Sequence, residues 1–61
     1  MMSLEDQLDS INAIAEELVK ALKSVQEDFD KENEGFGYIS EAVGKISAAI
    51  EDIETAWWAI A

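Results

Sequence analysis

Residues 4–29 read LEDQLDSINAIAEELVKALKSVQEDF, and apolar side chains recur along this stretch at steps of three or four residues. Residues 39–60, ISEAVGKISAAIEDIETAWWAI, repeat the pattern. Such spacing places the apolar side chains on one face of an α-helix. The two repeats consist of Leu4, Leu8, Ile11, Ala15, Leu18, Leu22, Val25 and Phe29, and of Ile39, Val43, Ile46, Ile50, Ile53, Trp57 and Ile60. The chain is therefore predicted to be all-α.

The segment between the repeats, Asn33-Glu34-Gly35-Phe36-Gly37, is too short for a flexible linker. Glycines adopt the positive φ values that a helix stop and a tight reversal use, so we expect a turn at 33–37. Ser3 is a suitable N-cap for the first helix. We predict one domain over 1–61, an antiparallel hairpin with helices at about 3–32 and 38–61.

In the first helix, Ile14 and Val19 widen the apolar stripe, which suits a bundle better than a strict two-stranded coil. In the second, Ala42, Ala49 and Ala56 recur at seven-residue spacing, and their small side chains let a neighbouring helix approach closely. Both features predict further helices beyond the hairpin itself.

Folding the chain about Gly35–Phe36 places residue i opposite roughly residue 71 − i, which leaves Leu4 and Leu8 without partners. Burying a leucine side chain contributes ~1.5–3 kcal/mol to stability. An overhang, in which two leucines of the first helix extend beyond the end of the second helix and stay in water, is therefore costly for a small domain. We therefore expect a homo-oligomer, first of all a dimer that forms a four-helix bundle. The residues predicted to lie in the oligomer interface are Leu4, Leu8, Ile11, Ile14, Leu18, Ile53, Trp57 and Ile60.

The composition is strongly acidic, with fourteen Asp and Glu against four Lys and Arg and a formal net charge of −10. Phosphate binding needs cations, so direct contact with nucleic acid or an anionic membrane is disfavoured. A basic protein partner fits, and one form of such binding is mimicry of nucleic acid by rows of acidic side chains. The candidate partner-binding residues are Trp58, Glu16, Glu17 and Glu51, with Trp58 an interface anchor or a cap on the bundle end.

The chain contains neither cysteine nor histidine, which removes disulfides and the usual ligands for zinc and haem. Glu51 and Glu54 have the Glu-x-x-Glu spacing of all-α nucleotide pyrophosphatases, but Glu16 and Glu51 are expected to face water rather than a shared site. We therefore expect that the protein is not an enzyme and binds no cofactor. The N-terminal sequence lacks the basic and apolar regions of a secretory signal, so a cytoplasmic protein is expected.

Residues 30–41, DKENEGFGYISE, resemble an EF-hand calcium loop. Asp30, Glu32, Glu34 and Glu41 stand at loop positions 1, 3, 5 and 12, with Gly35 at position 6. The resemblance implies Ca²⁺ coordination by these four carboxylates, although glutamates replace the shorter ligands at positions 3 and 5. A calcium-binding hairpin is the alternative to the leading hypothesis, a small non-enzymatic regulator, inhibitor or adaptor that binds other proteins.

Overall fold

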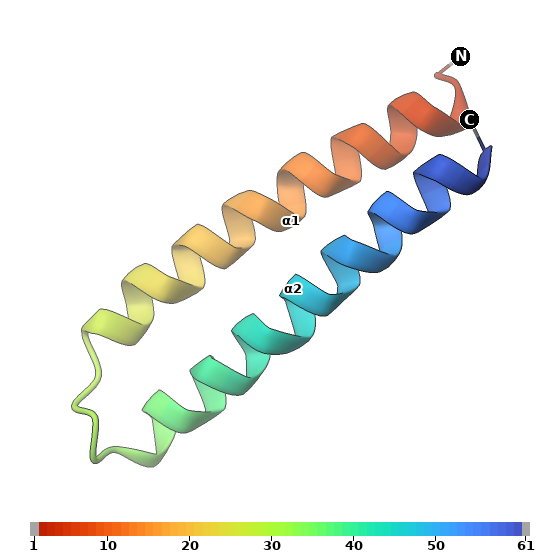
Figure 1. Cartoon of the computed structure of the whole chain (residues 1–61). Helices are drawn as coiled ribbons and strands as arrows, with labels where there is room; N and C mark the ends of the chain where they lie inside the picture. Colours follow the sequence, from red (N-terminus) through yellow and green to blue (C-terminus); the bar gives the residue numbers. More distant parts are fainter. Residues whose placement is uncertain (1, 61) are drawn as a thin grey trace.

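The computed structural model describes residues 2–60 and consists of two helices packed side by side in antiparallel orientation (Figure 1). The first helix, α1, spans Leu4–Glu27, and the second, α2, spans Glu34–Ile60. The predicted all-α hairpin is therefore confirmed. Met1 and Ala61, the ends of the predicted domain, lie outside the described residues.

Helix α1 begins as predicted, because the Ser3 side chain accepts a hydrogen bond from the Asp6 amide at 3.1 Å. The predicted end near residue 32 is wrong, since α1 stops at Glu27. Acidic residues crowd this end and its last turn has no basic side chain, so the helix dipole opposes further extension. The Asp28 and Phe29 amides bond back to Val25 and Gln26, which closes the last turn.

Helix α2 begins at Glu34, earlier than the predicted start near residue 38. The Asn33 side chain accepts a hydrogen bond from the Gly35 amide at 2.8 Å, which makes Asn33 the N-cap. The turn therefore lies at 28–33 instead of 33–37. None of the three glycines has a positive φ, so the predicted role of Gly35 and Gly37 in the reversal is also wrong.

The earlier turn changes the register of the hairpin. Leu8 and Asn12 lie beside Ile53 and Trp57, and Gln26 hydrogen-bonds to Ser40, so residue i lies opposite roughly residue 65 − i. The predicted overhang is wrong for Leu8, which is half-buried and lies beside Trp57. In this register Leu4 corresponds to Ala61, which lies outside the described residues. The start of α1 and the end of α2 lie at the same end of the hairpin (Figure 1).

The molecule is a thin rod, with backbone extents of 45 × 18 × 11 Å. Two helices packed side by side form a single layer, so both broad faces of the hairpin are open. No residue among those described is fully buried. Within 2–60, neither helix is long and apolar enough to cross a membrane.

Candidate functional site

The residues of α1 that face α2 are only in part the ones that the apolar repeat indicates. The half-buried positions from the second turn onward are Leu8, Asn12, Ala15, Val19, Leu22 and Gln26. These positions also follow a helical repeat, but it is rotated around the helix toward Asn12, Val19 and Gln26. Only half of the predicted stripe is therefore used within the hairpin.

The other half of the stripe, together with Ile14 beside it, is open to solvent. Five large apolar side chains of α1 are between 46% and 69% exposed: Leu4, Ile11, Ile14, Leu18 and Val25. In the sequence, each of them comes immediately before a half-buried residue. Together they therefore form a ridge beside the seam, by which we mean the line of contact between α1 and α2.

Helix α2 contributes a row of small side chains beside the same seam. Ala42, Ala49 and Ala56 each precede a half-buried residue, namely Val43, Ile50 and Trp57, and Ala49 and Ala56 are exposed. In two antiparallel helices packed side by side, positions that precede the seam lie on the same face of the pair. We call the α1 ridge together with Ala49 and Ala56 the open face.

The predicted oligomer-interface residues divide into two groups. Leu8, Ile53 and Trp57 are half-buried between the two helices of the hairpin itself. The remaining five, Leu4, Ile11, Ile14, Leu18 and Ile60, are exposed and available to another chain.

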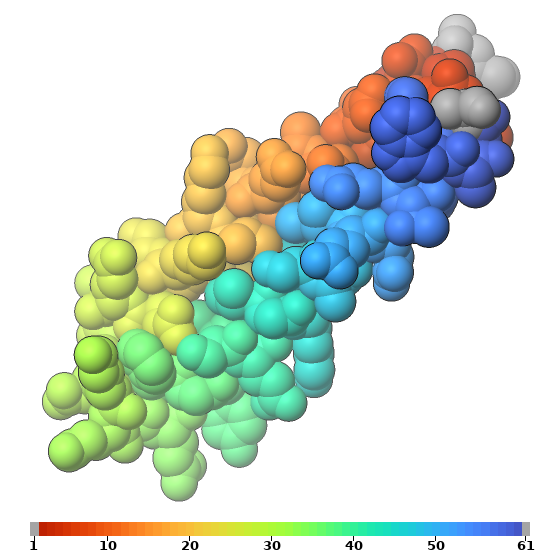
Figure 2. Space-filling view, viewed as in Figure 1, coloured from red at the N-terminus to blue at the C-terminus, as the bar shows by residue number. Residues whose placement is uncertain are grey.

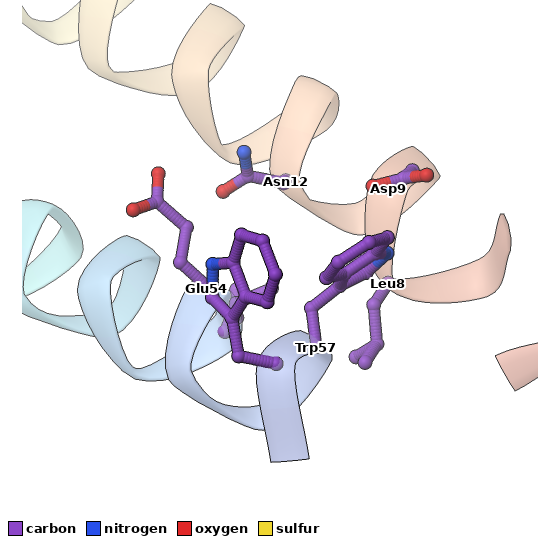
Figure 3. Close-up of a pocket in the computed structure, with 7 residues that line it drawn as sticks. Leu8, Asp9, Asn12, Glu54 and Trp57 are labelled. Atoms are coloured by element: carbon purple, nitrogen blue, oxygen red, sulfur yellow. The ribbon is translucent and has the colours of Figure 1, made fainter. Parts of the chain in front are cut away.

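A pocket of about 140 Å³ lies near the end of the rod where α1 begins and α2 finishes. Asp9 and Asn12 of α1 face Glu54 and Trp57 of α2 across it, and Trp58 completes the wall (Figure 3). The two indole rings are nearly perpendicular, with an interplanar angle of 81° and centroids 5.1 Å apart. Trp58 is 74% exposed, as expected for its outer position, and forms the corner of the pocket.

Two polar atoms at this pocket are buried without a hydrogen-bond partner among the described residues. They are Oδ1 of Asn12 and Nε1 of Trp57. An unsatisfied buried polar group costs about 1–3 kcal/mol, so a bound donor that pairs with the Asn12 oxygen would be stabilised there. Asn12 is a polar residue in a contact region that is otherwise mainly apolar, and the apolar repeat does not reveal its place there, because the repeat indicates Ile11 instead.

The acidic partner-binding candidates are all exposed, but they do not form one purely acidic surface. Glu16 and Glu51 line a shallow groove together with Lys20 and Lys23. Glu17 forms an ion pair with Lys20, whose Nζ lies 3.4 Å from its Oε1. The lysines thus moderate the negative charge in the middle of the rod, whereas the tryptophan pocket has only acidic charged residues in its wall.

The residues predicted to coordinate calcium do not form a metal site. Glu34 and Glu41 belong to α2, and Asp30 and Glu32 to the turn that precedes it. Helical geometry at 34–41 prevents the chain from wrapping around one cation as an EF-hand loop does. Among the described residues, no three Asp or Glu side chains lie close enough together to hold a metal ion.

Figure 2 shows the packed side chains of the two helices along the whole rod.

No protein-family model matches the chain, and no curated protein or solved structure is significantly similar to it. The open face and the tryptophan pocket are therefore the features of this protein that bear on its function.

Proposed function

We propose that this protein is a non-enzymatic protein–protein interaction module that works as a homodimer. Two hairpins pair through their open faces and form a four-helix bundle. The observation that carries the proposal is the exposed ridge of Leu4, Ile11, Ile14, Leu18 and Val25 beside the alanines of α2.

The energetic support comes from what the lone hairpin leaves in water. Burying each large aliphatic side chain contributes ~1.5–3 kcal/mol, and the ridge has five such side chains. Small domains have a net stability of only ~5–15 kcal/mol, so this contribution is large. Contiguous apolar surface of this kind on a folded protein marks an interaction site.

The shape of the open face favours one orientation of the second copy. The ridge is built from large side chains on α1, and the adjacent row on α2 is built from alanines. A two-fold axis parallel to the helices places α1 of each hairpin over α2 of the other, so that the ridge enters the alanine row. The turns of both copies then lie at the same end of the bundle.

The proposal is tested by placing a charge in the ridge. Leu18→Lys puts an ammonium group in the middle of the open face, and we expect a monomer in light scattering at the column peak. Ala13→Lys is the matched control, because Ala13 is exposed on the same helix and lies outside the ridge. A wild-type chain that is already monomeric, or a Leu18→Lys chain that remains dimeric, contradicts the proposal.

A basic protein is the second candidate partner, and nucleic-acid-binding proteins are the class that an acidic mimic would bind. Its support is the charge, fourteen acidic residues against four basic ones. Glu16, Glu17, Glu51 and Trp58 are exposed and accessible for such contacts. Replacing the three glutamates by glutamine should weaken binding to a basic protein and leave the mass of the homodimer unchanged.

A further inference from the structure

We propose that the tryptophan pocket binds an alkylammonium group, such as the end of a lysine side chain or a free primary amine. The walls that recognise the cation are the indoles of Trp57 and Trp58 and the carboxylates of Asp9 and Glu54. This inference does not depend on dimer formation, because the pocket lies between the helices of one hairpin.

The aromatic walls suit a cation. The faces of indole rings carry negative electrostatic potential and attract ammonium groups, and tryptophan is the best side chain for this contact. The two rings pack edge to face at 81° with centroids 5.1 Å apart, and the parts of the ring faces outside this contact are the surfaces that a cation can approach. Since Trp58 is 74% exposed, much of its ring surface is available to a ligand.

The charges around the pocket also select a cation. Asp9 and Glu54 are the charged residues that line it, and both are acidic. Among residues 2–60, neither carboxylate forms an ion pair, whereas Glu17 and Glu41 pair with lysines. The carboxylates come from different helices, so a bound cation would be attracted from both sides (Figure 3).

Asn12 supplies the hydrogen-bonding observation. Its Oδ1 has no donor among the described residues, and an ammonium group offers three N–H donors. Asn12 also lines the pocket, and its Oδ1 is the hydrogen-bond acceptor that we assign to the ligand.

The size of the pocket restricts the ligand. At about 140 Å³, it is smaller than the ~300–1,000 Å³ of pockets for drug-sized ligands. It accommodates the end of one side chain or a small amine and excludes a nucleotide. Weak binding is expected, with a dissociation constant on the order of 1 mM.

Both tryptophans of the chain line this pocket, so tryptophan fluorescence reports directly on its occupancy. We expect butylammonium chloride to change the emission in a saturable manner, and sodium chloride at equal ionic strength to leave it unchanged. Nα-acetyl-lysine amide carries the same terminal group and should bind at least as tightly. Equal responses to butylammonium and sodium chloride overturn the proposal.

The double variant Asp9→Asn with Glu54→Gln keeps the side-chain shapes and removes both charges. We expect it to weaken butylammonium binding by about tenfold or more. The matched control is Asp30→Asn with Glu32→Gln, which makes the same change of net charge in the turn at the far end of the rod. Equal weakening in both double variants would show general attraction to an acidic protein and would overturn the site.

Asn12→Leu separates a binding role from a structural one. Removing an unsatisfied buried acceptor should raise the midpoint of thermal unfolding, while the affinity for butylammonium falls. Unchanged affinity would contradict the assignment of Asn12. The same titration is repeated with the Leu18→Lys substitution present, which is expected to make the chain monomeric. The pocket lies within one hairpin, so we expect the affinity for butylammonium to be the same in the monomer.

Discussion

Gly35 illustrates how a residue can be needed for reasons other than backbone conformation. It lies in the first turn of α2, and a Cβ there would be 2.5 Å from Cε1 of Phe29 and 3.1 Å from Oδ1 of Asn33. Its hydrogen atom allows the Phe29 ring to pack against the start of the helix. A Cβ atom added at Gly37 or Gly44 would instead project into open space.

We therefore predict opposite effects for alanine at two glycines. Gly35→Ala should lower the free energy of unfolding by about 1–2 kcal/mol, because displacing Phe29 costs more than the gain in helix propensity. Gly44→Ala should raise it by about 0.5–1 kcal/mol, since the site is helical and unobstructed. Urea unfolding followed by circular dichroism measures both. Stabilisation by Gly35→Ala would show that the Phe29 contact is unimportant.

At the scale of the element, the caps decide where the two helices begin. Ser3 caps α1 and Asn33 caps α2 through hydrogen bonds of 3.1 and 2.8 Å. Acidic residues in both first turns interact favourably with the positive end of the helix dipole. Neither last turn has a basic residue, so the helix ends are less well stabilised than the starts.

Loss of the α2 cap should have a measurable cost. Asn33→Ala removes the acceptor for the Gly35 amide, and we expect the free energy of unfolding to fall by about 0.5–2 kcal/mol. For a domain of this size, each kcal/mol corresponds to roughly 4–8 °C in the midpoint of thermal unfolding. Asn33→Asp should behave almost as the native chain does, because aspartate is an equally good cap. An equal loss in both variants would rule out capping as the cause.

For the whole molecule, the proposed association would depend on the balance between repulsion of like charges and burial of apolar surface. A homodimer brings together two chains that each have a net charge of −10. Repulsion between them opposes the burial of the open faces, and dissolved salt screens it over a distance of ~10 Å at 0.1 M. A complex with a basic protein would respond to salt in the opposite direction.

We predict that the fraction of dimer increases with sodium chloride concentration. Sedimentation at a fixed protein concentration and increasing salt measures this fraction. Binding of a basic protein should weaken over the same range of salt. A dimer that dissociates as salt is added would indicate that ion pairs, and not the apolar ridge, hold the two copies together.

Some features of the hairpin were predictable because they follow from local residue patterns. The steps of three and four residues predicted two amphipathic helices, and Ser3 marked the start of the first. Asn33 and Glu34, a capping residue followed by an acidic one, are consistent with the observed start of α2, whereas the prediction assigned both residues to the turn because of the glycines that follow. Capping and dipole contributions are each on the order of 1 kcal/mol, so competing signals of this kind shift a helix boundary easily.

The tryptophan pocket was only partly predictable. Trp58 was expected to be an exposed contact residue, and it is exposed. Asp9, Asn12 and Glu54 were not selected, because nothing in a single helical repeat shows which outer residues of two helices meet. Their meeting depends on the register, which the turn at 28–33 determines.

Two amphipathic helices joined by a short polar turn follow directly from the amino-acid sequence, because side-chain period and capping are local properties. The register of the hairpin, and the part of the wide apolar stripe of α1 that packs against α2, became known only from the folded structure. A helix whose apolar sector is wider than one seam can turn either part toward its neighbour, and the choice depends on contacts across the hairpin. That choice leaves Leu4, Ile11, Ile14, Leu18 and Val25 exposed.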